Sequence, residues 1–288
     1  MSPRPDPSPA PFTLEALRFA HTLADLSDAI TLPAFRQGRA DRWQPPSGQP
    51  AADAGPEFEL KADGSPVTQA DRAAEDAMRR TIAERFPSHA VLGEEEGLQG
   101  PCDAPTWILD PIDGTKNFIR GVPVFATLIA LELEGRGVAA VVSAPALGIR
   151  WDGVAGGPAR QDGRDMRVSG VSHLSQAHVS FGGLSYFAGA TTDLITRLTG
   201  RTARQRGFGD FWQHCLVAAG GIDVALDAEV ERWDLAAPKI IVEAAGGRLT
   251  AFDGADTDAG GSALTTNGLL HEAALELIGS TAGKSARD

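Results

Sequence analysis

The ten-residue segment from Thr106 to Thr115, TWILDPIDGT, constrains the fold more than any other part of the chain. Its apolar first half has the length and composition of a buried strand that runs into Asp110. Pro111 lacks a backbone N–H and disfavours helix at the residue before it, so we expect the strand to end after Asp110. Asp113 to Thr115 then predict a turn that opens into a helix with free N–H groups.

This arrangement places carboxylates beside backbone donors. Asp110 and Asp113 are three residues apart, and their hard oxygen ligands can bind neighbouring divalent cations. The amides of Gly114 and Thr115, with the helix dipole, suit a phosphate group, and the Thr115 hydroxyl can orient a water molecule. Taken alone, the same residues also fit an ordinary Asp/Pro/Gly turn with a purely structural role.

Three further acidic clusters stand at strand ends or helix starts: Asp71, then Glu94 and Glu95 within GEEEG, and Asp234 within RWDLAA. Each has a plain alternative when taken alone. Asp71 fits a solvated helix carboxylate, GEEEG fits a solvated charge run, and Asp234 fits a helix N-cap. The combination of all four clusters is more specific than its parts and predicts one acidic cleft.

Net charge and cysteine content narrow the classes of function. The 288 residues carry 38 acidic and 26 basic side chains, a formal charge of −12, which argues against binding DNA or anionic membranes. Cys102 and Cys215 are far apart, so neither a disulfide framework nor a thiolate zinc site is expected, and a cytoplasmic setting fits best. The longest apolar run is far shorter than the roughly 20 residues that span a bilayer.

Hydrophobic periodicity predicts antiparallel strands in the first half of the chain and alternating strands and helices in the second. The expected helices are Thr13–Phe35, Thr68–Phe86, Thr191–Leu198, Phe211–Ala219 and Asp234–Ala245. The expected strands are Phe58–Lys61, Val91–Leu92, Thr106–Asp110, Thr127–Glu134, Val138–Ser143, His178–Phe181 and Ile222–Ala225, with a hairpin over Trp151–Ala159, a strand near Arg204, and closing strand and helix elements between Arg248 and Ile278.

We expect two structured halves between two tails. Residues 1–11 form a proline-rich disordered tail, and residues 279–288 form a flexible one. The half over residues 12–157 carries most of the candidate metal ligands, and the half over residues 158–278 carries the substrate side and Asp234. Proline and glycine in Gly38–Pro56 predict a mobile loop.

The acidic positions together resemble a known signature. Asp71, Glu94-Glu95, Asp110 to Thr115, and Trp233-Asp234 followed after eleven residues by Gly246-Gly247 resemble the inositol monophosphatase superfamily, which comprises Mg²⁺-dependent, lithium-sensitive phosphatases. The resemblance extends from about Phe12 to Ile278. It implies a layered αβαβα sandwich of mixed α+β and α/β character, a phosphomonoester substrate, two or three Mg²⁺ ions and a homodimer.

The resemblance also assigns roles to individual residues. It implies that Glu94, Asp110 and the Ile112 carbonyl bind the metal that activates water, and that Asp110, Asp113 and Asp234 bind the metal near the leaving oxygen. A third, weaker ion would lie by Glu94. Thr115 and Asp71 would orient or deprotonate the attacking water, while Asp113, Gly114, Thr115 and Asp234 would also lie against the phosphate.

Three segments resemble the histidinol-phosphate phosphatases of this superfamily: Asp110–Leu131, Met166–Leu184 and Arg206–Cys215. In the third, Asp210 stands where inositol phosphatases carry small neutral residues. A carboxylate there suits the ammonium group of L-histidinol phosphate, although Asp210 also fits a helix N-cap. Asp227 is a further candidate for contact with the substrate.

Several alternatives remain open at this stage. Lys116 fits either a phosphate contact or a surface lysine, and whether Glu229 and His214 contact the substrate is undecided. Inositol-1-phosphate, or a broad set of sugar phosphates, is the alternative substrate. A non-catalytic cation-binding scaffold is the alternative of another class, although every expected ligand position holds a carboxylate.

Overall fold

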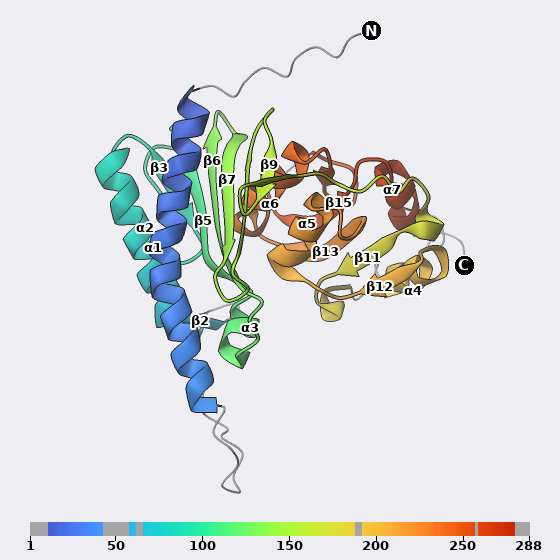
Figure 1. Ribbon diagram of the computed structural model, residues 1–288, viewed down its shortest axis with the longest axis horizontal. Coiled ribbons are helices and arrows are strands. Elements are labelled where there is room, and N and C mark those ends of the chain that lie inside the picture. Colours follow the sequence, from blue (N-terminus) through green and yellow to red (C-terminus); the bar gives the residue numbers. More distant parts are fainter. Residues whose placement is uncertain (1–10, 43–57, 62–65, 188–191, 257–258, 280–288) are drawn as a thin grey trace, which may run out of the picture.

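The computed structural model describes residues 11–42, 58–61, 66–187, 192–256 and 259–279. Its elements stack in five layers that alternate between helices and sheets (Figure 1). The helices, from one outer layer to the other, are α1 (Pro11–Arg42) and α2 (Gln69–Arg85), then α5 (Asp210–Ala218) and α6 (Arg232–Ala244), then α4 (Thr192–Arg201) and α7 (His271–Gly279). This order confirms the expected αβαβα sandwich.

The first sheet has eight strands in the order β10-β9-β8-β7-β6-β5-β3-β4. They are β3 (Ala90–Gly93), β4 (Gly97–Gln99), β5 (Thr106–Asp113), β6 (Ala126–Leu133), β7 (Arg136–Ala144), β8 (Ile149–Val154), β9 (Ala159–Gln161) and β10 (Arg164–Met166). Only β3 and β5 pair in parallel, which confirms the predicted antiparallel character of this part of the chain. A separate two-stranded ribbon joins β1 (Phe58–Leu60) to β2 (Pro66–Thr68).

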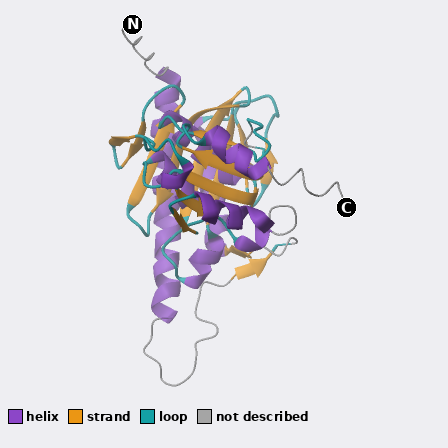
Figure 2. Ribbon diagram, turned by 90° about the vertical axis from the view of Figure 1, so that its right-hand side faces the viewer, coloured by secondary structure: helices purple, strands orange, loops and turns teal. Residues whose placement is uncertain are grey.

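The second sheet has five strands in the order β12-β11-β13-β15-β14. They are β11 (His178–Phe181), β12 (Arg204–Arg206), β13 (Val224–Val230), β14 (Arg248–Thr250) and β15 (Gly261–Thr266), and two short 3₁₀ turns, η1 (Leu174–Gln176) and η2 (Leu184–Phe187), flank β11. Figure 2 views the stack from the side of α4 and α7. Strand β13 continues past the expected end at Ala225, because its pairing with β15 resumes beyond a bulge between Asp227 and Val230.

Helix α1 is longer than the sequence predicts. It begins at Pro11 and continues through Gly38 to Arg42, so the first residues of the expected loop are helical. One glycine costs about 1 kcal/mol against alanine, and the alanine and arginine residues around it favour helix. Phe35 also anchors this end, with its ring 4.9 Å from that of Phe125. The rest of the expected loop and both expected tails, apart from Pro11 and Gly279, lie outside the described residues.

The described helices show no membrane span. None of them combines the length and the apolar character that crossing a lipid bilayer requires.

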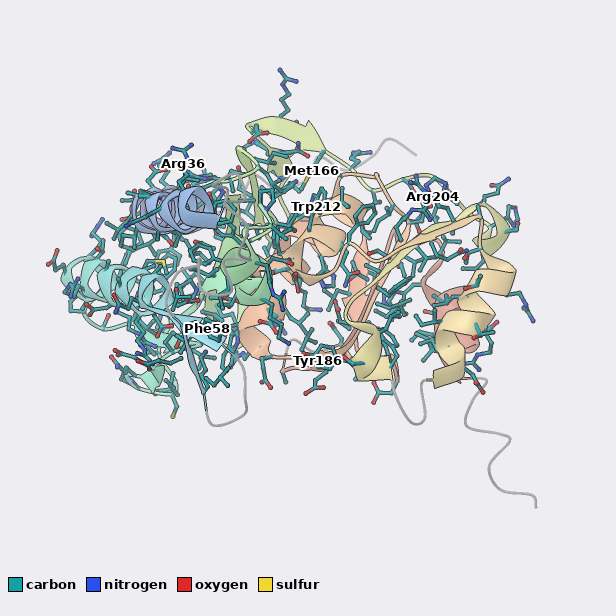
Figure 3. The ribbon with its side chains drawn as sticks, turned by 90° about the horizontal axis from the view of Figure 1, so that it is seen from below. Arg36, Phe58, Met166, Tyr186, Arg204 and Trp212 are labelled. Carbon is teal, nitrogen blue, oxygen red and sulfur yellow. The ribbon has the colours of Figure 1, made fainter. Side chains whose placement is uncertain are left out.

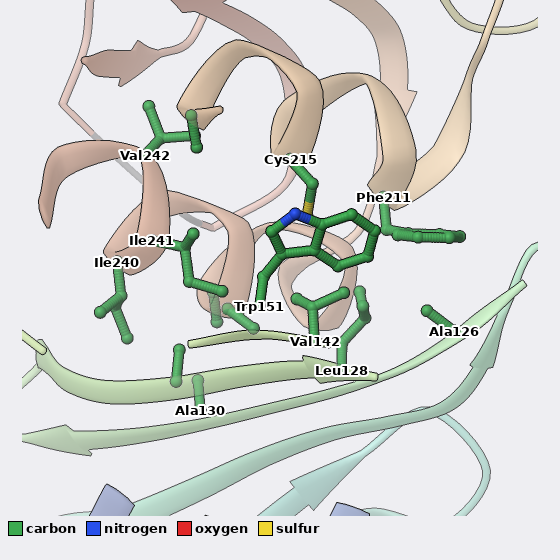
Figure 4. Packing of buried hydrophobic residues seen from close by; sticks show 14 of the residues in the cluster. Ala126, Leu128, Ala130, Val142, Trp151, Phe211, Cys215, Ile240, Ile241 and Val242 are labelled. Atoms are coloured by element: carbon green, nitrogen blue, oxygen red, sulfur yellow. The ribbon is translucent and has the colours of Figure 1, made fainter. Parts of the chain in front are cut away.

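The largest hydrophobic core lies between the first sheet and the helices α5 and α6 (Figure 4). Trp151 of β8 is 2% exposed, and its ring lies 6.0 Å from that of Phe211 on α5. Its indole N–H donates to Gln161 at 3.2 Å, so burial leaves no polar atom of this side chain unsatisfied. This core fixes α5 and α6, which carry Asp210 and Asp234, against the sheet that carries Asp110.

Replacing Trp151 with alanine tests how far this core stabilises the fold. We expect Trp151→Ala to lower the free energy of unfolding by about 3–5 kcal/mol, because it removes buried area and leaves a cavity. Urea unfolding would measure the change. Leu269→Ala, at a side chain that is 61% exposed, is the matched control and should shift stability by no more than about 0.5 kcal/mol. Equal effects of the two substitutions would contradict this description of the core.

Candidate active site

Three carboxylates meet where β5 ends against α6. Single oxygen atoms of Asp110, Asp113 and Asp234 all lie within 4.8 Å of one another. Asp110 is 1% exposed, and burial together with the nearby charges of Glu94 and Asp113 holds its pKa well above the ordinary value. Three carboxylates at this separation repel one another strongly in a buried setting. The arrangement therefore needs either protons or cations to neutralise it.

The course of β5 brings Asp110 and Asp113 to this point. The prediction that the strand ends after Asp110 was wrong, because β5 continues through Pro111 to Asp113. Its pairing with β6 shifts register between Asp110 and Asp113, which is where a proline without an N–H fits in a sheet. The Pro111 carbonyl accepts a hydrogen bond from the Thr127 hydroxyl at 2.9 Å, and the Ile112 N–H donates to Asp110 Oδ1 at 2.9 Å.

The predicted helix after this strand is α3 (Thr115–Arg120), and Gly114 is its N-cap. Gly114 adopts a left-handed conformation with φ of 82°, and a Cβ there would lie 3.0 Å from the Val124 carbonyl. Both constraints favour glycine. The Thr115 hydroxyl donates to the Ile112 carbonyl at 3.0 Å, which leaves its oxygen lone pairs available as acceptors.

Asp234 enters the cluster from the first turn of α6. The helix N-cap is Glu231, whose backbone N–H donates to Asp234 Oδ2 at 2.8 Å in a capping box. Asp234 is therefore not the N-cap itself, although one of its oxygens stabilises the helix start. Burial, followed by the charges of Glu94 and Asp227, raises the pKa of Asp234 to about 7.

Asp71 is buried in the first turn of α2, which excludes the alternative of a solvated helix carboxylate. The backbone N–H of Thr68 donates to Asp71 Oδ2 at 2.8 Å, while Oδ1 is buried and has no hydrogen-bond partner. Burial, together with the charges of Glu94 and Glu95, raises the pKa of Asp71 to about 7. An unpaired buried carboxylate oxygen is costly unless a ligand, a water molecule or a proton completes it.

Glu94 and Glu95 share one cation from the protein itself. The Lys61 ammonium lies 2.7 Å from Oε1 of each glutamate, so this charge run is not simply solvated. The pKa of Glu95 is raised, chiefly by burial. Behind the turn, the backbone N–H groups of Glu95 and Glu96 donate to Glu75, which is 0% exposed.

A glycine makes this close packing behind the glutamates possible. A Cβ on Gly93 would lie 2.4 Å from Glu75 Oε1, and Arg79 pairs with the same oxygen at 2.8 Å. The turn that carries Glu94 and Glu95 thus rests on a buried ion pair. The sequence reasoning did not find Glu75 and Arg79, although their i,i+4 spacing was a usable signal.

A cavity of about 170 Å³ adjoins the carboxylate cluster. Most of its polar lining is acidic: Asp113, Asp210, Asp227, Glu229 and Asp234, with His214, Tyr186, Gly182, Gly183, Phe211 and Val230 completing the wall. The structure therefore brings together the predicted metal ligands and the predicted substrate carboxylates. Glu229 and His214, whose contact with the substrate the sequence leaves open, both line this cavity.

Asp210 faces this cavity from the start of α5. Gly209 is the N-cap and no side chain caps the helix, so the N-cap alternative for Asp210 was wrong. Asp210 instead accepts a hydrogen bond from the Asn117 amide at 2.9 Å. Asp210 is exposed as a residue, but the surrounding protein displaces water from its carboxylate, and this desolvation, followed by the charge of Asp227, raises its pKa to about 6.

Tyr186 closes the rim of the cavity and is a residue that sequence reasoning missed. It is the only tyrosine in the chain and is labelled in Figure 3. Its hydroxyl accepts a hydrogen bond from Lys116 at 2.9 Å, and Lys116 itself is exposed at the surface. A Cβ on Gly183 would lie 2.9 Å from the Tyr186 ring, which shows how closely the chain packs beneath it.

The raised pKa values of Asp71 and Asp234 predict that the metal-free protein loses stability as the pH rises from about 5 to about 8. Both pKa values move from 3.8 to about 7, so the folded chain holds these protons more tightly than the unfolded chain. This stabilising contribution is complete below the unfolded pKa and is lost as the pH rises through the folded pKa. The melting temperature in EDTA should therefore fall over this range.

Magnesium provides the control for this measurement. Saturating Mg²⁺ binds ionised carboxylates, so it should raise the melting temperature more at about pH 8 than at about pH 5. A melting temperature in EDTA that rises steadily with pH would contradict the raised pKa values.

Comparison with known proteins places this arrangement in a family. Residues 51–284 match the model of the inositol monophosphatase family. The chain is 47% identical to a histidinol-phosphatase of Mycobacterium tuberculosis over 76% of this chain and 86% of the relative. It is 40% identical to a histidinol-phosphatase of Streptomyces coelicolor over 93% of this chain and 97% of the relative.

A solved structure agrees with the sequence comparison. An inositol monophosphatase from Zymomonas mobilis superposes with a TM-score of 0.77 at 30% identity, covering 92% of this chain and 98% of that one. The chain belongs to the inositol monophosphatase family of metal-dependent phosphatases.

Proposed function

We propose that the protein hydrolyses L-histidinol phosphate to L-histidinol and inorganic phosphate, as a step of histidine biosynthesis. The observation that carries this proposal is the acidic wall of Asp210, Asp227 and Glu229 beside the carboxylate cluster. L-histidinol carries an ammonium group and an imidazole, and an acidic wall favours such a leaving group over a neutral or anionic one. The names of the two histidinol-phosphatase relatives support the same substrate.

The residues present fit divalent cations. They offer hard carboxylate oxygens and, at Asp71, a buried oxygen without a partner. Glu94, Asp110 and the Ile112 carbonyl would hold one Mg²⁺, and Asp110, Asp113 and Asp234 a second, with a third, weaker ion by Glu94. Bound Mg²⁺ supplies positive charge that neutralises the phosphate ester and acidifies the attacking water.

The protein's own groups then position the attacking water and accept its proton. The Thr115 oxygen can accept a hydrogen bond from this water, because the Thr115 hydroxyl proton is already donated to the Ile112 carbonyl. Asp71 Oδ1 can take the proton, since Oδ2 is engaged by the Thr68 backbone. The N–H groups at the start of α3, at Gly114 and Thr115, can hold the phosphate oxygens.

On the other side of the phosphate, the cavity binds the leaving group. Asp210 and Asp227 face the ammonium group, and the Tyr186 ring on the rim offers a flat surface for the imidazole. A charge-assisted pair of this kind contributes about 1.5–3 kcal/mol. That free energy corresponds to a selectivity of roughly ten- to a hundredfold.

Two other functions are the rivals of this proposal. The similarity to an inositol monophosphatase structure keeps inositol-1-phosphate, or a broad set of sugar phosphates, as the second substrate class. The second rival is a non-catalytic scaffold that has the same fold and binds cations but hydrolyses no phosphate ester. Asp110, Asp113 and Asp234 keep their carboxylates together, which favours catalysis over a scaffold role.

Asp110→Asn tests the metal-dependent reaction. Asp110 is proposed to contact both main cations, so the substitution should lower kcat by several orders of magnitude while the protein remains folded. Phosphate release with Mg²⁺ and with EDTA would measure it, with circular dichroism as the control for folding. Turnover that survives both the substitution and chelation would contradict the proposed reaction.

Asp210→Ala tests the choice of substrate. We expect the ratio of kcat/KM for L-histidinol phosphate to that for inositol-1-phosphate to fall by roughly ten- to a hundredfold, because the ammonium group loses a charged partner. The wild-type ratio is the reference and should favour L-histidinol phosphate. A wild-type preference for inositol-1-phosphate would overturn the proposed substrate.

Assembly and location complete the proposal. We propose a homodimer, as the family resemblance implies, and a cytoplasmic enzyme that binds neither nucleic acid nor membrane. Cys102 and Cys215 are both free thiols in the structure, which is compatible with a reducing compartment. Light scattering should give the mass of two chains, and the mass of one chain would contradict the dimer.

A further inference from the structure

Asp227 is held from one side by two neighbouring side chains. It lies in β13 and is 7% exposed. Its Oδ2 atom lies 3.0 Å from Nε2 of His214 and also accepts a hydrogen bond from the Gln213 amide. Two partners on a single oxygen fix the carboxylate in one orientation and leave Oδ1 for the opposite side.

Gly182 makes room for that second oxygen. It follows β11, which pairs in parallel with β13, and a Cβ on Gly182 would lie 2.0 Å from Asp227 Oδ1. The φ angle of Gly182 is not positive, so an alanine there would meet no backbone penalty. Glycine is therefore needed at position 182 because a side chain would clash with the Asp227 carboxylate, and not because of its backbone conformation.

His214 is a buried residue with a defined partner at each ring nitrogen. It is 2% exposed, and its Nδ1 lies 2.8 Å from the Thr265 hydroxyl of β15. The ring thus connects α5 to two strands of the second sheet. Because Asp210 lies one helical turn earlier on α5, the ring also lies near the second carboxylate of the cavity wall, and its charge favours the ionised form of Asp210.

Holding two carboxylates on one small cavity has an electrostatic cost. Asp210 and Asp227 both line the cavity of about 170 Å³, and the charge of Asp227 disfavours ionisation of Asp210. Without fixed partners, Asp227 would relieve this repulsion by turning away from Asp210. The contacts of Oδ2 with His214 and Gln213 prevent that rotation. The missing side chain at Gly182 leaves room for Oδ1 in the same orientation.

We propose that His214 and Gly182 position Asp227 so that Asp227 and Asp210 act as a carboxylate pair that selects a cationic leaving group. His214 acts through Asp227 and is a positioning residue, not a catalytic one. This inference rests on the proposed function and adds to it the means by which the substrate class is chosen. It predicts that selectivity can be lost while the metal-dependent chemistry remains intact.

Two variants disturb Asp227 from opposite sides. His214→Leu removes both ring contacts, and Gly182→Ala inserts a methyl group against Oδ1 while leaving His214 in place. Each should raise KM for L-histidinol phosphate about tenfold and raise KM for inositol-1-phosphate by a clearly smaller factor, so that the preference for L-histidinol phosphate falls. His214→Gln, whose amide can replace the Nε2 donor, should restore most of the lost affinity.

Three controls separate positioning from general damage. Gly170→Ala adds a methyl group where no atom lies within 4 Å, and it should match the wild type. The Mg²⁺ affinity of each variant, measured by calorimetry, should equal that of the wild type. Asp227→Asn should give the same KM change as His214→Leu, and combining the two should add little, because both remove the same contact.

The outcomes distinguish this inference from the function on which it rests. If the wild type does not prefer L-histidinol phosphate, the proposed function and this inference both fail. If the wild type shows the preference and folded Gly182→Ala and His214→Leu both keep it, the proposed function stands and the positioning by His214 and Gly182 is wrong. Equal KM increases for both substrates would also overturn the inference.

Discussion

Electrostatic repulsion among buried carboxylates is the constraint on which the rest of the structure depends. Asp110, Asp113 and Asp234 lie within 4.8 Å of one another, and Asp71 is buried with one oxygen unpaired. No gain in packing explains such a cluster, because burial disfavours every one of these charges. Three rigid local structures hold these carboxylates together: the bulge in β5, the capping box at the start of α6 and the capping box at the start of α2. A site of this kind is stable with its charge neutralised, and divalent cations do that while leaving the carboxylates ionised.

Electrostatic repulsion between carboxylates also occurs in the cavity beside the cluster, where it favours a cationic leaving group. Asp210 and Asp227 also repel each other, but they line an open space and not a ligand cage. A cationic leaving group relieves their repulsion, whereas a neutral polyol leaves it in place. Hydrogen bonds from Asn117 and Gln213, and the close approach of His214 to Asp227, hold the two carboxylates in place before any substrate binds. Preorganisation of this kind lowers the cost of binding, since the repulsion has already been overcome in folding.

Much of this arrangement was predictable from the sequence, and the rest was not, for physical reasons. Strand-ending acids and their spacing predicted one acidic cleft, because strand ends meet along one edge of a sheet and a turn needs particular residues, while the family resemblance supplied the expected ligand roles. The course of β5 through Pro111 was missed, because a proline at a bulge reads locally as the end of a strand. The extension of α1 to Arg42 was missed as well, since Phe35 anchors it only through tertiary contacts. His214 and Tyr186 contact residues that are far away in the sequence, so no local sequence pattern could predict these contacts.

The central claim is that these carboxylates are gathered in order to hold divalent cations. Anomalous diffraction from crystals soaked in Mn²⁺ tests it most directly, because it locates each ion without reference to activity. The account predicts one peak among Asp110, Asp113 and Asp234 and another beside Glu94 and Asp110, with both lost in Asp110→Asn. An ordered cluster with no peak at saturating Mn²⁺, or peaks that survive unchanged in Asp110→Asn, would contradict it.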